Sequence, residues 1–301
     1  MNNSLKDSEY RGRFAPSPSG PLHFGSLVAA LGSYLTARAA GGRWLIRIED
    51  IDPLREQPGA SLAFLDTLSA FGMQSDEPVW FQSRRLAHYR QALEQLIASG
   101  HAYSCMCSRA QLQAFGGIHP AVCPDGSDGD RPRSWRLRVE SAGSIVTDDR
   151  RSGAFSQSLA DTVGDFVIWR SDDWPAYQLA VVVDDAAQGI TEVVRGADLL
   201  DSTPRQIWLQ RCLGFPQPGY LHLPLAVDAE GRKLSKSDAA RPIDATNPLP
   251  SLRAALAFLG QDAVMADQPD AFLAEAVAQF DDKRIPATNT RLIAGLNPIS
   301  R

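Results

Sequence analysis

A strand, loop, helix and second strand near the start of this 301-residue chain constrain its fold more than any other feature. The expected first strand covers Tyr10 to Ala15, the loop PSPSGPLHFG follows, and an Ala/Leu-rich helix covers Ser26 to Ala40. After Gly41 and Gly42, the segment RWLIRIEDID begins as a buried strand and ends in carboxylates. Open α/β sheets bind nucleotides at such a junction, because free backbone N–H groups and the helix dipole meet there. The sequence therefore predicts an α/β fold built on a Rossmann-like parallel sheet.

The rest of the chain divides into further parts around this sheet. The first half of the sheet domain is expected to cover 1–80, and 81–172 is predicted to be an α/β insertion with a metal site. The apolar run LAVVVDD and the segment GITEVVRGADLL predict that the chain returns to the sheet within 173–237. A short helical region is predicted for 238–301. Helices are expected at 61–71, 84–99, 203–213, 249–259 and 270–280.

Composition narrows the class of protein. Hydrophobic residues make up 44% and charged residues 22% of the chain, which is typical of a globular fold. No apolar run approaches the roughly 18 residues that a membrane span needs, and the first ten residues lack the apolar core of a secretory signal. We therefore expect a cytoplasmic protein with no membrane partner. The net charge of -5 disfavours a uniformly positive surface but permits a local groove for RNA phosphates.

Two loops carry residue types suited to phosphate chemistry. In PSPSGPLHFG, small residues let the backbone approach a phosphate and His23 adds a donor at the helix entrance, although a plain connection explains the loop equally well. In KLSKS, Lys233 and Lys236 stand three apart with hydroxyls between them, which suits the charge of a transferring phosphoryl group. A solvated basic loop is the alternative reading of KLSKS.

Both loops belong to a longer pattern. RFAPSPSGPLHFGS, RIEDID, the block from YQLAVVVDD through GITEVVRGADLL to TPRQ, and KLSKS resemble, in order, the glutamyl-tRNA synthetase group of class I aminoacyl-tRNA synthetases. HFGS corresponds to the HIGH signature of that class, with Phe24 and Ser26 at its second and fourth positions. The resemblance implies that ATP, with Mg²⁺, lies across the two loops, and that His23, Lys233 and Lys236 are catalytic. The implied ATP-binding residues are Pro16, Ser17, Gly20, His23, Gly25, Ser26, Lys233, Leu234, Ser235, Lys236 and Ser237.

The resemblance also implies a site for L-glutamate. Its implied residues are Arg13, Phe14, Ala15, Pro16, Ser17, Glu49, Tyr177 and Arg195. Their charges agree with this ligand, because two guanidinium groups and one carboxylate match two carboxylates and one ammonium. Asp50 and Asp52 either organise the strand end or are solvated. We expect the glutamate α-carboxylate to attack the α-phosphorus of ATP without a protein nucleophile.

Three of the four cysteines fall in the stretch YSCMCSRAQLQAFGGIHPAVC. Cys105 and Cys107 can present both sulfurs to one side, and His119 and Cys123 follow with the spacing H-x3-C. These four ligands predict one structural Zn²⁺ per chain, with a cluster of reduced thiols as the alternative. Cys212 lies in an apolar helical pattern and is expected in the core.

The part of the chain after Ser237 suggests the acceptor of the activated glutamate. It is shorter than the helical anticodon-binding region of complete glutamyl-tRNA synthetases, so the resemblance narrows to their truncated paralogues, which lack that domain. These paralogues imply a monomer that activates glutamate without tRNA and attaches it to the queuosine base in the anticodon of tRNA(Asp). The alternatives are a conventional enzyme that charges the 3′ end of tRNA and a non-catalytic binding protein. Four basic residues of the insertion either contact RNA phosphates or are solvated: Arg131, Arg133, Arg136 and Arg138.

Overall fold

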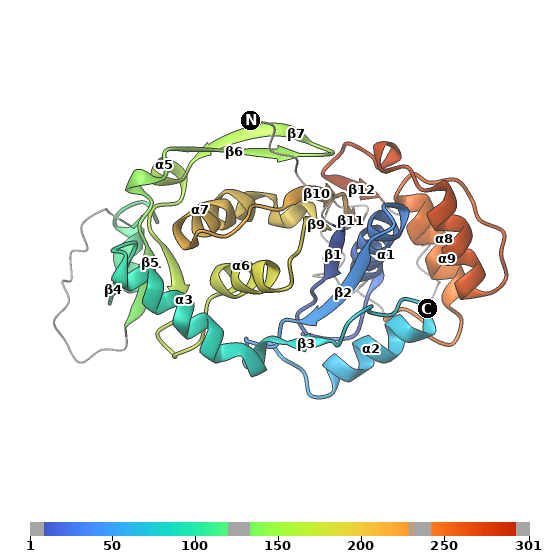
Figure 1. The fold of residues 1–301 in the computed structure, drawn as a ribbon, viewed down its shortest axis with the longest axis horizontal. Coiled ribbons are helices and arrows are strands. Elements are labelled where there is room, and N and C mark those ends of the chain that lie inside the picture. The colour runs from blue at the N-terminus through green and yellow to red at the C-terminus, as the bar shows by residue number, and fades with distance from the viewer. Residues whose placement is uncertain (1–8, 120–132, 229–230, 232–241, 293–301) are drawn as a thin grey trace.

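The computed structural model describes residues 9–119, 133–228, Gly231 and 242–292. Its central parallel strands form two groups that meet in the middle of the molecule (Figure 1). One group contains β1 (Arg11–Phe14), β2 (Arg43–Ile48) and β3 (Trp80–Phe81), in that order. In the other group, β9 (Glu192–Gly196) pairs with β10 (Gly219–Leu223). The Thr191 amide donates to the Arg11 carbonyl at 3.0 Å, which places the beginning of β9 beside the beginning of β1.

Helices cover both sides of these strands, as the βαβ pattern predicts (Figure 1). On one side lie α1 (Phe24–Ala39), α8 (Pro248–Phe258) and α9 (Pro269–Gln279), with α2 (Ala60–Ala70) below them. On the other side lie α6 (Tyr177–Ala187), α7 (Thr203–Leu213) and α3 (Leu86–Ala98), which follows a 3₁₀ turn at Gln82–Arg85. Each side has its own hydrophobic core. All six expected helices are therefore present, with ends within two residues of the expectation.

The apolar run LAVVVDD lies in α6 and not in a strand, so its assignment to the sheet was wrong. Every residue from Leu179 to Asp185 is buried, so this stretch faces protein on all sides and its apolar residues show no 3.6-residue periodicity. Three consecutive valines favour a strand by intrinsic propensity, but tertiary packing overrides that preference here. The second half of the prediction is confirmed, because GITEVVRG contains strand β9.

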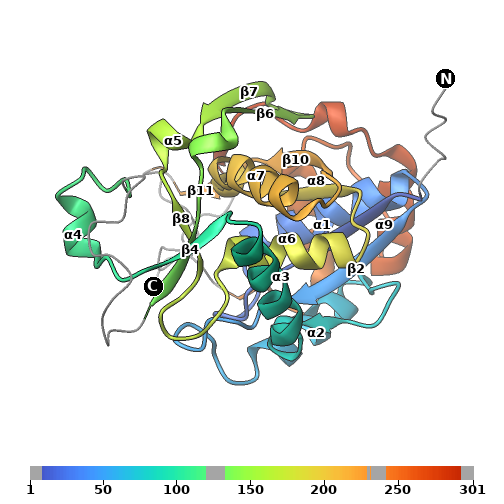
Figure 2. The same ribbon diagram turned by 60° about the vertical axis from the view of Figure 1, so that its left-hand side comes forward.

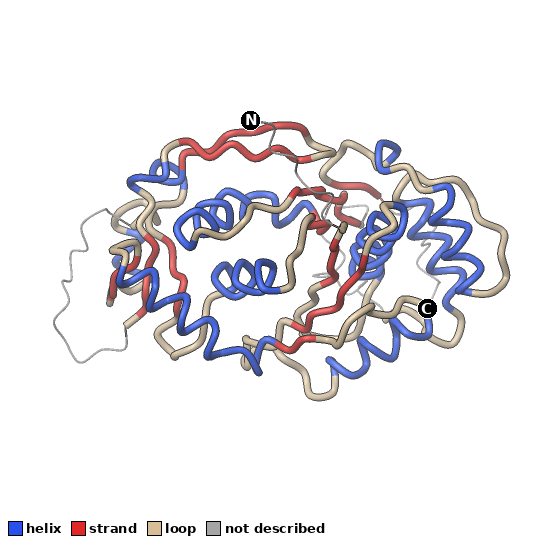
Figure 3. The backbone as a smooth tube through the Cα atoms, in the orientation of Figure 1, coloured by secondary structure: helices blue, strands red, loops and turns tan. Residues whose placement is uncertain are grey.

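The region between α3 and α6 contains two β structures. A small antiparallel sheet is formed by β4 (Ala102–Cys105), β5 (Ser134–Leu137) and β8 (Phe166–Trp169), and α4 (Arg109–Gln113) lies at its outer edge (Figure 2). The hairpin of β6 (Ser144–Asp149) and β7 (Gly153–Ser158) runs back across the top of the molecule (Figure 3). There Asp149 pairs with Tyr220 of β10, so the hairpin joins the second strand group.

Short elements complete the described chain. A 3₁₀ turn at Glu140–Ala142 precedes β6, and α5 (Leu159–Thr162) follows β7. A 3₁₀ turn at Ala197–Ser202 precedes α7, and β11 (Leu225–Val227) pairs in parallel with β12 (Thr290–Leu292), which follows a turn at Asp282–Arg284. Within the described part of the chain, no helix is both long and apolar enough to cross a bilayer.

Candidate functional site

The loop after β1 leads directly into the first turn of α1, where His23 is the N-cap residue. The backbone N–H of Ser26 donates to His23 Nδ1 at 3.2 Å, so in the neutral ring Nε2 carries the proton and donates to Ser26 Oγ at 3.1 Å. A side chain at Gly25 would lie within 3.3 Å of the imidazole, so glycine lets the ring fold over the turn. Ser26, which departs from the HIGH signature, is therefore the partner that holds His23.

Two backbone hydrogen bonds join the loop PSPSGPLHFG to the chain that follows β2. The Glu49 amide donates to the Pro16 carbonyl at 2.9 Å, and the Gln57 amide donates to the Pro18 carbonyl at 3.0 Å. Gly20 has a φ of 151°, a backbone conformation that side chains disfavour. This loop and the N-terminus of α1 together present backbone N–H groups at the carboxyl edge of the sheet, which suits a phosphate.

The second phosphate loop, KLSKS, lies outside the described residues, and so do Lys233, Leu234, Ser235, Lys236 and Ser237. The chain that follows it is described from Pro242. The Ile243 amide donates to the Leu22 carbonyl at 3.0 Å, and Pro242 forms a β-bridge with His23. The segment after KLSKS therefore returns to the HFGS junction.

Arg13 and Glu49, two of the residues implied for glutamate, belong to one buried charge network. Arg13 Nε lies 3.1 Å from Asp185 Oδ1, and Arg47 NH2 lies 2.8 Å from the same oxygen. Arg47 NH2 also lies 3.4 Å from Glu49 Oε1. Burial opposes the charged form of Arg47, but the carboxylates of Asp185, Asp184 and Glu49 raise its pKa above the usual value. Arg47 is therefore a cation that binds these acidic side chains together.

Asp184 anchors the other side of the network. Its carboxylate accepts hydrogen bonds from Tyr89 Oη at 2.7 Å, Gln82 Nε2 at 3.0 Å and Arg85 Nε at 2.7 Å. Neighbouring residues of a helix point about 100° apart, so Asp184 and Asp185 reach different partners from α6. The sequence reasoning missed Arg47, Asp184 and Asp185 as site residues. The sequence does contain a signal for them, because each is a charged residue within or directly beside a run of apolar residues.

Glu49 and Tyr177 line a small pocket of about 100 Å³ at this edge of the sheet. Ser17 of the first loop also lines it, together with Gln82, Pro175, Ile51, Asp52, Arg55 and Arg170. Burial raises the pKa of Glu49 to about 7, although Arg47 and Arg13 oppose that shift. Burial also raises the pKa of Tyr177, with Arg195 and Arg13 acting against it and Glu49 adding to it. The structure thus brings Arg13, Glu49 and Arg195 within electrostatic reach of Tyr177.

Arg195 has a different environment from Arg13, although both side chains are buried. Its guanidinium donates to His222 Nε2 at 3.0 Å, Gln206 Oε1 at 2.8 Å, Thr203 Oγ1 at 2.8 Å and the Leu199 carbonyl at 3.1 Å. All four partners are neutral acceptors. The positive charge of Arg195 is therefore oriented by the protein without a directly bonded carboxylate among the described residues.

The two aspartates after β2 have distinct roles. Asp50 accepts from Ser83 N at 2.9 Å and Ser83 Oγ at 2.6 Å, so it organises the turn before α3. Asp52 lines the pocket, accepts from Arg55 Nε at 2.6 Å and lies 3.8 Å from Arg170 NH1.

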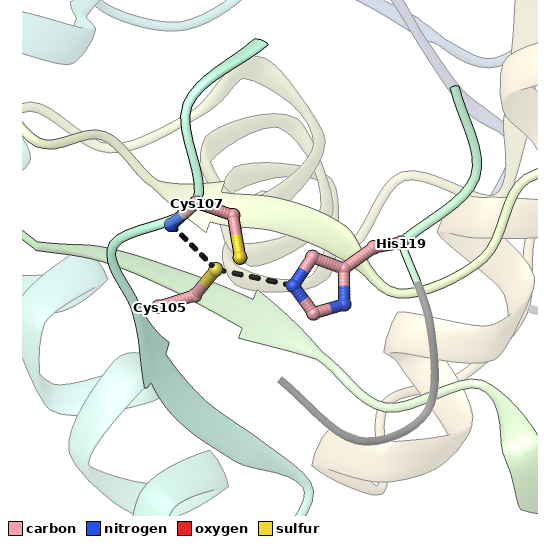
Figure 4. Close-up of side chains that lie close together, drawn as sticks. All are labelled: Cys105, Cys107 and His119. Carbon is pink, nitrogen blue, oxygen red and sulfur yellow. Dashed lines mark hydrogen bonds between the residues drawn. The ribbon is translucent and has the colours of Figure 1, made fainter. Parts of the chain in front are cut away.

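A possible metal-binding group lies at the end of β4 (Figure 4). The ligand atoms of Cys105, Cys107 and His119 all lie within 4.8 Å of one another, and Cys105 Sγ is 3.2 Å from His119 Nε2. The fourth predicted ligand, Cys123, lies outside the described residues. Two sulfurs and an imidazole are a donor set that suits zinc.

The surroundings of His119 suit a metal ligand. Tyr103 Oη donates to Asp165 Oδ2 at 2.7 Å and contacts His119 Nδ1 at 3.0 Å, so the neutral ring keeps its proton on Nδ1. Nε2, which faces Cys105, is then left with its lone pair. Arg136 is buried and bonds to Cys105 Sγ and the Asp165 carbonyl. Arg136 therefore supports this cluster, and its burial fits neither of the two expected roles, an RNA contact or a solvated charge.

Comparison with known proteins identifies the class to which this fold and site belong. The family described as tRNA synthetases class I (E and Q), catalytic domain, matches residues 9–119 and 117–256. Solved structures agree at the level of the fold. A glutamate-tRNA synthetase from Elizabethkingia anophelis is 25% identical with a TM-score of 0.80, over 96% of this chain and 68% of that one. A glutamate tRNA ligase from Elizabethkingia meningosepticum, in complex with its amino acid, has a TM-score of 0.79 at 24% identity, over 95% and 67%.

Curated relatives narrow the class further. Glutamyl-Q tRNA(Asp) synthetase of Xanthomonas campestris pv. campestris is 58% identical over 92% of this chain and 93% of that protein. The protein of the same name from Burkholderia cenocepacia is 56% identical over 89% and 94%. The chain therefore belongs to the glutamyl-Q tRNA(Asp) synthetase family.

Proposed function

We propose that this enzyme uses ATP to activate L-glutamate without tRNA, and then transfers the glutamate to the queuosine base in the anticodon of tRNA(Asp). The observation that supports activation is the meeting of Arg13, Arg195 and Glu49 around Tyr177 at the carboxyl edge of the sheet. Two cations and one anion there match the two carboxylates and one ammonium of glutamate. Membership of the glutamyl-Q tRNA(Asp) synthetase family supports the acceptor.

Each charged group has a distinct task in the proposed binding. Arg195, whose described hydrogen-bond partners are all neutral, attracts a carboxylate of the ligand, and Arg13 attracts the other although it is already paired with Asp185. Glu49 binds the ammonium. Because burial raises the pKa of Glu49 to about 7, an adjacent ammonium favours its ionised form and is bound in return.

Activation is proposed to proceed by in-line displacement. The glutamate α-carboxylate attacks the α-phosphorus of ATP, a new C–O–P bond forms, and pyrophosphate leaves with its electron pair. His23 and the amides of the first turn of α1 are proposed to bind the phosphates, with Lys233 and Lys236 stabilising the leaving charge. Mg²⁺ bound to ATP neutralises phosphate charge. In the second step a hydroxyl of the queuosine ring attacks the glutamyl carbonyl, the bond from that carbonyl carbon to the phosphate oxygen breaks, and AMP leaves with the hydroxyl proton on its phosphate as the ester forms.

The two proposed steps, activation and transfer, are tested in separate assays. We expect the wild-type protein to catalyse glutamate-dependent exchange of labelled pyrophosphate into ATP without RNA. Labelled glutamate should then appear on tRNA(Asp) that contains queuosine, and not on tRNA(Asp) without it or on tRNA(Glu). Equal labelling of both forms of tRNA(Asp), or labelling of tRNA(Glu) alone, contradicts the proposed acceptor. Absence of exchange contradicts activation and would identify a binding protein.

We further propose that the cluster of Cys105, Cys107 and His119 holds one structural Zn²⁺ per chain, with Cys123 as the fourth ligand. Zinc would hold the end of β4 against the segment that contains His119. Metal analysis of protein purified without added zinc is expected to find about one zinc per chain, because such a donor set is completed by a single tetrahedral ion.

The matched pair for this prediction is Cys105→Ser and Cys212→Ser. The first variant loses a ligand and is expected to lose its zinc. Cys212 of α7 packs against the second hydrophobic core and is not one of the predicted ligands, so its variant should keep the metal. Folded wild-type protein without metal, or a Cys105→Ser protein with full zinc, would defeat the assignment.

We also propose that the enzyme acts as a monomer in the cytoplasm, where ATP, glutamate and tRNA are available.

A further inference from the structure

A row of three buried side chains connects the β6–β7 hairpin to the candidate glutamate site. Asp149 ends β6, His222 lies in β10, and Arg195 lies opposite His222 in β9. Asp149 Oδ2 is 2.7 Å from His222 Nδ1, and His222 Nε2 is 3.0 Å from Arg195 Nε. All three residues are at most 5% exposed, so water does not compete for these bonds.

The donors and acceptors of this row have only one consistent arrangement. The Nε of Arg195 always carries hydrogen, so His222 Nε2 must be the acceptor. The proton of the neutral ring is then on Nδ1 and is donated to Asp149. Asp149 is itself fixed, because Oδ2 also accepts from the His222 amide at 2.9 Å and Oδ1 accepts from the Ser152 amide at 2.7 Å. These hydrogen bonds therefore fix the orientation of the Arg195 guanidinium group.

The neutral imidazole matters because it orients Arg195 without cancelling its charge. A carboxylate in the position of His222 would pair with Arg195, as Asp185 pairs with Arg13. Burial lowers the pKa of His222, with Arg195 and Arg151 acting in the same direction and Asp149 against it, which favours the neutral ring that the hydrogen bond from Arg195 requires. The guanidinium has five N–H bonds, and His222, Gln206, Thr203 and Leu199 accept four. Among the described residues, one NH1 hydrogen is left for a ligand.

We propose that Asp149 and His222 are positioning residues that hold Arg195 in the orientation in which it binds a carboxylate of glutamate. This inference depends on the proposed function, because that proposal assigns Arg195 to the amino acid. It gives the β6–β7 hairpin a task in substrate recognition, although the hairpin lies outside the strand, loop and helix unit that binds nucleotide.

Two substitutions of His222 separate positioning from mere packing. In His222→Gln, the side-chain carbonyl can take the place of Nε2 and accept from Arg195. In His222→Asn, the shorter amide can take the place of Nδ1 and donate to Asp149, but it offers Arg195 no acceptor. We expect His222→Asn to raise the KM for glutamate in pyrophosphate exchange about 10-fold, the effect of one lost hydrogen bond to a charged group. kcat and the KM for ATP should stay near wild type, and His222→Gln should restore most of the KM.

A surface control and a substitute variant complete this test. His88 of α3 is exposed, so His88→Asn serves as the matched surface control. If a His222 variant does not fold by circular dichroism, Asp149→Asn takes its place, and the same selective rise in the KM for glutamate is expected. Equal KM values for His222→Asn and His222→Gln, or a KM unchanged from wild type, overturn the inference. Wild-type protein without exchange overturns the proposed function instead, so the two failures are distinguishable.

Discussion

Alanine in place of Arg195 is expected to lower kcat/KM for glutamate in ATP–pyrophosphate exchange by on the order of 100-fold, a loss of about 3 kcal/mol. The substitution removes a buried cation whose described partners are all neutral, so a carboxylate of the ligand loses its counter-charge. The loss should fall mainly on KM, because the interaction is made in the ground state as well as in the transition state. Steady-state exchange over a range of glutamate concentrations measures both constants.

The control for this experiment comes from α7, the helix that supplies Thr203 and Gln206 to Arg195. Arg211 is exposed in the last turn of α7, and Arg211→Ala should keep the wild-type KM for glutamate. Arg195→Lys keeps the charge but not the planar array of donors, so it should rescue Arg195→Ala only in part. A KM for glutamate in Arg195→Ala equal to that of Arg211→Ala would remove Arg195 from the binding site.

Methionine in place of Arg47 is expected to lower the free energy of unfolding by about 3–5 kcal/mol. Arg47 is fully buried and lies within 4 Å of Glu49, Asp184 and Asp185. Without Arg47, these three carboxylates lose a neutralising cation in a site that water does not reach, which destabilises the folded state. Equilibrium unfolding in urea, followed by circular dichroism, measures the difference from wild type.

Arg43 provides the comparison, since it lies in the same strand and also forms ion pairs. Its side chain is 47% exposed, and its partners Glu9 and Glu77 are at the surface. Arg43→Met should therefore change the free energy of unfolding by no more than about 1 kcal/mol. Similar losses for Arg43→Met and Arg47→Met would show that burial of the network contributes nothing to stability.

Much of the candidate site was predictable because its parts are local in the sequence. The loop PSPSGPLHFG and the helix after it are adjacent in the chain, so His23 at the N-terminus of α1 follows from short-range pattern alone. Glu49 likewise follows from its place at the end of an apolar strand. Cys105, Cys107 and His119 lie within fifteen residues, and the structure does bring them together.

The residues that the sequence did not reveal are those whose partners are distant in the chain. Asp185 meets Arg13 across 172 positions, and Asp149 meets His222 across 73. Nothing in a local pattern distinguishes such an aspartate from a solvated one. Tyr103, which supports His119 from β4, escaped notice for the same reason.

The amino-acid sequence by itself determined the βαβ unit and the position of every helix that it predicted, because helix periodicity, glycine-rich turns and strand ends act over a few residues. The tertiary structure alone decided that LAVVVDD is a helix, that Arg47 joins three carboxylates, and that Arg195 is held by His222. The physical reason is burial. A charge in the interior requires a partner, and only the packing of remote segments determines which residue that partner is.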